Sequence, residues 1–238
     1  MKAYPKVTII ISCFNEEANI EKCIRSVASA MPESEILVVH GGTDRTSEIA
    51  TRLKTEISAV RVVRNENDRG KGHAIRKGIE CATHDVMAQF DADNQFFATD
   101  LPALVDPILE GRADVTLGSR FLPSADRSAY KPSFFRDYGN RTLSAYVGLL
   151  CGKKVTDVTA GVKAWTLKAI QAIDLTDDKY SYEAEIVVRA FRLGLRVKDI
   201  PVRYSSRSAG ESMHTSSMKV IIAGLTIMKN CLSYRFRS

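Results

Sequence analysis

From Val7 to Ser119 the sequence alternates short runs of β-branched residues with longer segments of helical periodicity. This alternation is typical of a mostly parallel sheet covered by helices, because parallel neighbours need a long crossover between them. The apolar runs expected to be strands lie at residues 7–12, 35–39, 61–63, 86–90 and 115–119. The sequence therefore predicts an α/β fold in which ligands bind beyond the carboxyl ends of the strands.

The helical segments between these runs can be placed from their apolar spacing. Asn15 stands ahead of the first helical pattern and is expected to cap it, with Glu16 and Glu17 in the first turn. The pattern loosens after residue 120 into an expected loop. Helices are then expected from about Phe134 and over 182–193, with short extended segments at 162–165 and 197–202.

The size of the chain indicates how many domains it forms, and its charge indicates which partners it can bind. A chain of 238 residues commonly forms one main α/β domain. Its net charge of +6 favours acidic partners, which include nucleic acid, an anionic membrane and phosphorylated small molecules. The basic residues are scattered, without an aromatic-interleaved stripe, so nucleic acid is the least expected partner.

Cysteine spacing and hydropathy indicate the compartment. None of the five cysteines forms a C-x-x-C pair, so reduced thiols are expected in place of a zinc site or disulfides. The apolar run after the N-terminus is too short for a signal peptide, and no stretch reaches the roughly 20 apolar residues of a membrane span. A cytoplasmic protein is expected.

Two carboxylates mark the strongest chemical motif. Asp91, Ala92 and Asp93 follow the apolar run VMAQF, which places both acids at the end of a strand. Gln95 adds a third oxygen two residues later, and hard oxygen ligands suit Mg²⁺ or Mn²⁺. A D-x-D triplet alone also occurs in ordinary solvent-exposed turns, so the surrounding sequence must show whether it binds a metal.

With these motifs in view, the chain resembles the family 2 glycosyltransferases, in the branch of dolichyl-phosphate mannose synthase and dolichyl-phosphate glucosyltransferase. The matching stretches, in family order, are ISCFNEEANI (11–20), EILVVHGGTDRT (35–46), NDRGKGHAIRKGI (67–79), FDADNQ (90–95), LGSRF (117–121), TDVTAGVKAW (156–165) and RSAGES (207–212). Together they cover nearly the whole chain, which makes the resemblance far more specific than any one motif.

The resemblance implies a GT-A type, Rossmann-like fold that binds a nucleotide sugar. It implies that Asp91, Asp93 and Gln95 hold the cation against the donor diphosphate, and that Asp93, Arg120 and Arg207 take part in catalysis. The two arginines resemble family arginines that contact diphosphate or acceptor phosphate, a task suited to planar charged forks. The implied contacts to the donor and its cation are Ser12, Phe14, Asn15, Glu16, His40, Asp44, Lys71, Gly72, Arg76, Asp91, Ala92, Asp93 and Gln95.

The chain departs from the family pattern at two places. After its second strand the family usually has acidic residues, where this chain has His40 and Gly41 and is one residue shorter. An acid expected to contact the base or ribose is therefore missing; His40 either contacts the base or is an ordinary loop histidine. Met213 stands where relatives often carry a lysine, which removes one expected contact to the acceptor phosphate.

No catalytic base is evident beyond the acidic pair assigned to the metal; Glu183 and Glu185 face either the site or solvent. A polyprenyl phosphate needs no base, because its oxygen is already anionic at neutral pH. The predicted reaction is an inverting transfer of a hexose from GDP-mannose or UDP-glucose to polyprenyl or dolichyl phosphate.

The C-terminal segment extends this prediction to a membrane. Residues 1–217 are expected to form the catalytic domain and 218–238 an amphipathic helix that lies in the membrane interface. The alternative is an ordinary amphipathic helix that packs on the domain or on a partner subunit. A membrane-protein partner subunit is a separate expectation. The predicted location is the cytoplasmic face of a membrane, with peripheral attachment.

Three other functions remain open from the sequence. A related transferase could use a soluble or protein-linked acceptor, which would require a base. A nucleotidyltransferase would release diphosphate from a nucleoside triphosphate. A noncatalytic subunit would bind the sugar nucleotide without turnover.

Overall fold

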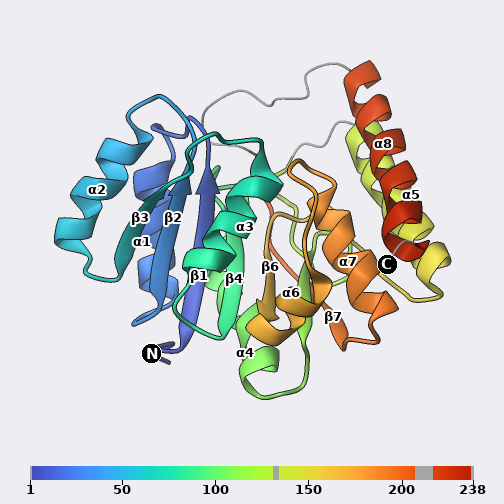
Figure 1. Ribbon diagram of the computed structural model, residues 1–238, viewed down its shortest axis with the longest axis horizontal. Helices are drawn as coiled ribbons and strands as arrows, with labels where there is room; N and C mark the ends of the chain where they lie inside the picture. Colours follow the sequence, from blue (N-terminus) through green and yellow to red (C-terminus); the bar gives the residue numbers. More distant parts are fainter. Residues whose placement is uncertain (1, 131–133, 207–216, 237–238) are drawn as a thin grey trace.

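The computed structural model describes residues 2–130, 134–206 and 217–236, and a single seven-stranded sheet runs through it (Figure 1). The spatial order of the strands is β3-β2-β1-β4-β6-β5-β7. The strands are β1 (Val7–Cys13), β2 (Glu35–His40), β3 (Val60–Arg64), β4 (Val86–Asp91), β5 (Val115–Ser119), β6 (Lys163–Thr166) and β7 (Val197–Pro201). The expected α/β fold is confirmed.

The sheet is mostly parallel, with one exception. Strands β3, β2, β1 and β4 pair in parallel, and β5 pairs in parallel with β7. Strand β6 lies between β4 and β5 and is antiparallel to both. The extended segment expected at 162–165 therefore joins the two parallel halves of the sheet.

Helices cover both faces of the sheet, and side-chain alternation along the strands divides the core. Ile9 and Ile11 pack with one buried cluster and Ile10 with the other, as the two-residue period of a strand requires. The first cluster is covered by α1 (Ile20–Ala30), α2 (Thr46–Glu56) and α4 (Leu101–Leu109). The second is covered by α3 (Lys71–Cys81), α5 (Phe134–Cys151), α6 (Leu167–Ile173), α7 (Tyr182–Arg192) and α8 (Ser217–Phe236).

The prediction that Asn15 caps the first helix is wrong. Helix α1 begins at Ile20 with Asn19 at the capping position, and Glu21 is the acidic residue of its first turn. Asn15 instead has a left-handed backbone with φ of 55°. Asparagine tolerates this conformation better than most residues, so Asn15 makes a turn directly after β1.

The C-terminal helix α8 packs against the rest of the α/β fold. It contacts α5 and α7, and its residues Cys231 and Tyr234 are buried (Figure 1). In the part of the chain that the structure describes, no helix is both long enough and apolar enough to cross a membrane. All five cysteines are free thiols, as predicted.

Candidate active site

The expected site residues meet where the central strands end. Ser12 is paired with Asp91 across β1 and β4, and Cys13 is paired with His40 across β1 and β2. The register therefore brings the ends of three strands to the same level of the sheet. This is the edge at which open α/β sheets bind ligands.

The Asp91–Asp93 turn is held by its neighbours on both sides. Asp91 ends β4, and a Cβ atom at Gly161 would lie only 1.8 Å from its Oδ2 atom, so the carboxylate fits only against a glycine. The backbone N–H of Gln95 donates to Asp93 Oδ1 at 3.1 Å. Asn94 has a left-handed backbone and donates through Nδ2 to the carbonyl oxygen of Asn19.

Beneath this turn lies a charged network that the sequence did not indicate. The Lys71 ammonium is 2.8 Å from Asp91 Oδ1 and 3.0 Å from Glu183 Oε1. Lys163 is fully buried, donates to the Ala160 carbonyl oxygen and lies 4.0 Å from Glu183 Oε2. Two ammonium groups therefore alternate with two carboxylates below the strand end.

Burial and charge set the protonation behaviour of this network. Burial raises the pKa of Asp91 to about 6 despite Lys71, and the carboxylates of Asp93 and Glu183 add to the rise. Burial acts to lower the pKa of Lys71, but Asp91 and Glu183 raise it well above its usual value. Burial lowers the pKa of Lys163. Crowded carboxylates of this kind are stabilised by a bound cation.

The donor set at the turn fits a hard divalent cation. Asp91 and Asp93 supply carboxylate oxygens, and Gln95 leaves its amide oxygen available because its Nε2 atom donates to the Ser205 carbonyl oxygen at 3.2 Å. Within residues 2–130, 134–206 and 217–236, no group of three or more His, Cys, Asp and Glu side chains could hold a metal ion. The predicted Mg²⁺ or Mn²⁺ site thus consists of two carboxylates and one amide.

The turn after β1 is tied to the loop after β2. Asn15 Oδ1 accepts hydrogen bonds from the backbone N–H groups of Thr43 and Asp44 at 2.9 and 3.3 Å. The Glu16 N–H donates to Thr46 Oγ1, and Asp44 Oδ1 accepts from the Thr46 backbone. Phe14 projects from this turn with 56% of its surface exposed. Four of the predicted donor contacts therefore form one connected rim.

His40 is buried below that rim, and both of its ring nitrogens lie within hydrogen-bond distance of protein groups. Its exposed fraction is 1%, the Gly42 N–H donates to its Nδ1 atom, and Arg64 lies 2.8 Å from its Nε2 atom. Burial lowers the pKa of His40, and Arg64 lowers it further. The arrangement favours a neutral loop histidine over a group that faces the base.

Two other predicted donor contacts pack against the loop between α6 and α7. A Cβ atom at Gly72 would lie 2.2 Å from the Asp177 carbonyl oxygen, so this glycine allows α3 to approach the loop. Arg76 donates to the carbonyl oxygens of Leu175 and Thr176 and forms an ion pair with Asp178. Both residues position α3, and through it Lys71.

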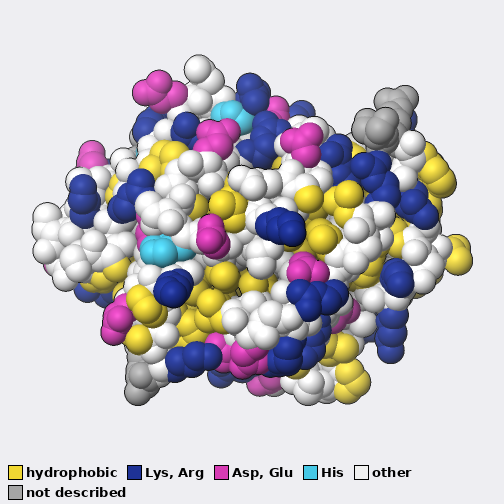
Figure 2. Space-filling view, turned by 60° about the horizontal axis from the view of Figure 1, so that its bottom comes forward, with side chains coloured by type: hydrophobic (Ala, Val, Ile, Leu, Met, Phe, Trp, Pro, Cys, Tyr) yellow, Lys and Arg dark blue, Asp and Glu magenta, His cyan; other side chains and the backbone are white. Residues whose placement is uncertain are grey.

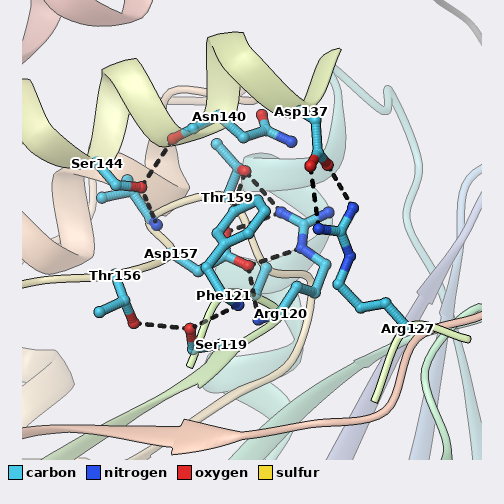
Figure 3. A network of polar contacts seen from close by, with 12 residues as sticks. Ser119, Arg120, Phe121, Arg127, Asp137, Asn140, Ser144, Thr156, Asp157 and Thr159 are labelled. Carbon is cyan, nitrogen blue, oxygen red and sulfur yellow. Dashed lines mark hydrogen bonds and ion pairs between the residues drawn. The ribbon is translucent and has the colours of Figure 1, made fainter. Parts of the chain in front are cut away.

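Arg120 is held in a buried ion pair at the end of β5 (Figure 3). Its Nε and Nη2 atoms donate to the two carboxylate oxygens of Asp157 at 2.7 and 2.8 Å, and Asp157 is fully buried. Asp157 raises the pKa of Arg120 against the opposing effect of burial. The guanidinium carbon lies 5.0 Å from the centre of the Tyr204 ring.

Sequence reasoning missed the arginines that surround Phe121. Arg127 forms a two-point ion pair with Asp137, as Figure 3 shows, and Arg141 lies 4.3 Å from the centre of the Phe121 ring. The Arg141 side chain is 57% exposed, which makes it the accessible member of the group. Isolated arginines in a loose pattern carry no signal for this clustering. Arg207 and Met213 lie outside the described residues.

One face of the molecule agrees with the scattered charge of the sequence. On the face that Figure 2 shows, Lys and Arg side chains are interspersed with acidic ones and form no continuous stripe.

The chain as a whole is similar to known proteins. The sequence profile described as "Glycosyl transferase family 2" matches residues 8–168. Undecaprenyl-phosphate mannosyltransferase of Micrococcus luteus is 30% identical over 215 residues, which are 87% of this chain and 86% of that protein. Glycosyltransferase AglD of Haloferax volcanii is 30% identical over 211 residues, which are 85% of this chain and 33% of AglD.

A solved structure shows the same fold. Glucosyl-3-phosphoglycerate synthase of Mycobacterium tuberculosis, crystallised with Mn²⁺, uridine diphosphate and glucosyl-3-phosphoglycerate, aligns with a TM-score of 0.74 at 21% identity. The alignment covers 97% of this chain and 79% of that one. The GT-A architecture implied by the sequence motifs is thereby confirmed.

Proposed function

This chain belongs to glycosyl transferase family 2, and we propose that it transfers a hexose from a nucleotide sugar to a polyprenyl phosphate with inversion at the anomeric carbon. The observation that carries the proposal is the Asp91, Asp93 and Gln95 group at the end of the central strand β4. The name of the Micrococcus relative, an undecaprenyl-phosphate mannosyltransferase, supports the acceptor class.

The donor would be a GDP- or UDP-linked hexose bound across the carboxyl ends of β1, β2 and β4. Asp91, Asp93 and Gln95 would hold Mg²⁺ or Mn²⁺, which stabilises as a Lewis acid the charge that develops on the departing diphosphate. Lys71 keeps the Asp91 carboxylate in place from below at 2.8 Å. The connected rim of Asn15, Glu16 and Asp44 would position the nucleoside.

The two acids considered as bases are already engaged. Glu183 pairs with Lys71, and Glu185 accepts from the backbone N–H groups of Thr176 and Asp177 while it pairs with Arg189. Glu183 is 6% and Glu185 0% exposed. A phosphate acceptor suits this arrangement, because its anionic oxygen attacks the anomeric carbon without losing a proton.

The arginine group around Phe121 would receive the acceptor phosphate. Arg120 and Arg127 pair with Asp157 and Asp137 and are mostly buried, whereas Arg141, 4.0 Å from Asp137, is 57% exposed. Arg120 would contribute a positive electrostatic potential from inside the fold. Arg141 would bind the phosphate oxygens directly through its guanidinium group. Arg207, which the family resemblance also assigns to phosphate binding, would join from the segment after Ser206.

The membrane part of the proposal concerns residues 218–238, with the catalytic domain in 1–217. Helix α8 turns Ile222, Leu225, Leu232 and Phe236 outward with 46–73% exposure, while Cys231 is buried against the fold. Lys229 and Arg235 lie on the same helix, and basic residues beside an apolar face favour an anionic bilayer surface. The protein would attach peripherally at the cytoplasmic face, alone or with a membrane partner subunit.

A transfer assay tests the function. Purified protein, undecaprenyl phosphate and MnCl₂ or MgCl₂ are incubated with radiolabelled GDP-mannose, UDP-glucose or UDP-N-acetylglucosamine, and organic-extractable label is counted. We expect transfer from one hexose donor that EDTA and Asp93→Ala abolish, whereas Glu66→Ala keeps it. Absence of transfer from every donor, in an assay validated with a known synthase, would exclude the lipid acceptor and favour a soluble one.

A further inference from the structure

The place of the missing acid after β2 is filled from another loop. Position 41 is a glycine, and a Cβ atom built on it would lie 2.1 Å from Oδ2 of Asp68 and 2.6 Å from its carboxyl carbon. The Asp68 carboxylate, from the segment between β3 and α3, therefore occupies the space in which a side chain at position 41 would begin. Gly41 and Asp68 exclude a larger residue and supply an acid at the same point.

The two oxygens of Asp68 have different surroundings. Oδ1 accepts from Asn65 Nδ2 at 3.0 Å and from the Gly70 backbone N–H at 2.9 Å. No hydrogen bond from residues 2–130, 134–206 or 217–236 reaches Oδ2, the atom turned toward Gly41. The Asp68 side chain is 11% exposed. One oxygen thus fixes the carboxylate and the other keeps its capacity to accept.

This oxygen lies beside the rim that is proposed to position the nucleoside. The Gly41 N–H donates to the Cys13 carbonyl oxygen at the end of β1. A Cβ atom at the adjacent Gly42 would lie 2.2 Å from Asn15 Oδ1, so the Asn15 turn borders the same point. His40, the other residue at this strand end, is buried and engaged with Gly42 and Arg64.

We propose that Asp68 Oδ2 recognises the donor nucleobase by accepting a hydrogen bond from its ring N–H. The inference rests on the proposed function and deepens it. Uracil at N3 and guanine at N1 both present such an N–H beside a carbonyl group, whereas cytosine at N3 and adenine at N1 present a lone pair. An ionised carboxylate only accepts hydrogen bonds, so it binds the first pair of bases and repels the second.

Nucleotide binding tests this assignment independently of sugar transfer. Calorimetry with MnCl₂ compares UDP, GDP, CDP and ADP on the wild-type chain and on Asp68→Asn. In this variant the side-chain oxygen of the new asparagine can still accept hydrogen bonds from Asn65 and Gly70. The NH₂ group then takes the place of Oδ2 and faces the base. We expect the wild type to bind UDP or GDP about tenfold or more tighter than CDP and ADP, and Asp68→Asn to reduce that ratio about tenfold.

Two further variants separate recognition from folding. Gly41→Ala keeps Asp68 but displaces its carboxylate, so it should weaken binding of the preferred nucleotide to a similar degree. Glu66→Gln, an exposed acid of the same segment, should leave all four affinities unchanged. Inorganic pyrophosphate, which lacks a base, should bind all these chains equally.

The binding and transfer experiments test the role of Asp68 and the proposed function separately. An unchanged base preference in Asp68→Asn, with pyrophosphate binding intact, would overturn the role of Asp68 even if sugar transfer to lipid is observed. So would a wild-type chain that does not distinguish UDP and GDP from CDP and ADP. A failed lipid assay with the expected nucleotide preference would overturn only the acceptor.

Discussion

The ammonium nitrogen of Lys71 lies 2.8 Å from Oδ1 of Asp91, the carboxylate that ends the central strand. Glu183 holds the other side of the same ammonium group at 3.0 Å. One positive charge thus balances two carboxylates at the point where a divalent cation is expected. The protein can keep this acidic strand end folded before any metal or nucleotide binds.

Lys71→Met should reveal this role as a change in stability. Without this ammonium, the buried Asp91 loses its cationic partner and Glu183 keeps only Lys163 at 4.0 Å, which costs about 3 kcal/mol or more of unfolding free energy. A bound cation would replace the lost charge, so MnCl₂ should restore part of the loss. Urea denaturation with and without MnCl₂ measures both effects. Lys77→Met, on the exposed face of α3, should change neither, and equal stability of both variants would contradict the role.

Gly161→Ala should impair the carboxylate turn without a change in charge. The added methyl group would lie 1.8 Å from Asp91 Oδ2 and must displace it. A displacement of about 1 Å in a catalytic group can cost roughly 100-fold in rate, so we expect a loss of that order in sugar transfer. Gly139→Ala is the matched control, because its methyl group meets no atom within 4 Å. Equal activity of the two variants would show that the turn tolerates the shift.

Arg120→Ala should destabilise the fold strongly. It leaves Asp157 fully buried without its two-point partner, which costs about 3–5 kcal/mol. Arg112→Ala removes an exposed ion pair with Glu110 and should cost less than about 1 kcal/mol. Thermal and urea unfolding of both variants give the comparison. Similar losses would mean that the Asp157 pair contributes no more than a surface contact.

The stability of the protein should depend on pH through His40. Burial and Arg64 hold the pKa of His40 below its usual value, so the unfolded chain binds a proton that the folded chain does not. The free energy of unfolding should therefore fall as pH drops below about 6.5, the ordinary histidine pKa, toward the lower folded-state pKa. His40→Gln should lose less stability between pH 7.5 and 5.5 than the wild type. A larger loss of stability in His40→Gln than in the wild type would contradict a lowered pKa of His40 in the folded protein.

Leu225→Asp should weaken attachment to membranes. Leu225 is 61% exposed on α8, so the substitution alters the outer face and leaves the buried Cys231 and Tyr234 in place. Replacing an inserted leucine by a charge should reduce binding about tenfold or more. Sedimentation with vesicles of phosphatidylcholine and phosphatidylglycerol measures this. Leu109→Asp, the same change at the end of α4, is the control; undiminished binding of Leu225→Asp would exclude this face as the contact.

The sequence predicted the strands and the place of the Asp91–Asp93 motif at a strand end because both depend on local pattern. The apolar run before Asp91 makes a buried strand, and that strand places the two acids at the sheet edge. The family motifs placed the arginine at position 120 but not its commitment to Asp157, which lies 37 residues away. Local spacing gives no information about which distant charge will balance a buried one.

Contacts between residues distant in the sequence also explain the other features that the sequence did not predict. Asparagine is a residue type that often caps helices, which is why the sequence predicts a cap at Asn15. Its side chain instead binds backbone groups 28 and 29 residues away, so a tertiary contact determines its role. Glu183 could not be assigned to site or solvent, because its partner Lys71 is 112 residues distant. The antiparallel pairing of β6 is likewise nonlocal, since an apolar run does not reveal the direction of its neighbours.

The central position of β6 has a consequence for how the protein folds as it is synthesised. Strands β1 to β4 come first in the sequence and form one parallel layer in the order β3-β2-β1-β4, so this layer can assemble once residue 91 has emerged. Strand β5 has no place beside that layer until residues 163–166 arrive to bridge it to β4. The growing chain therefore holds an unpaired β4 edge until residues 163–166 have emerged, and that edge is open to mispairing before the sheet closes.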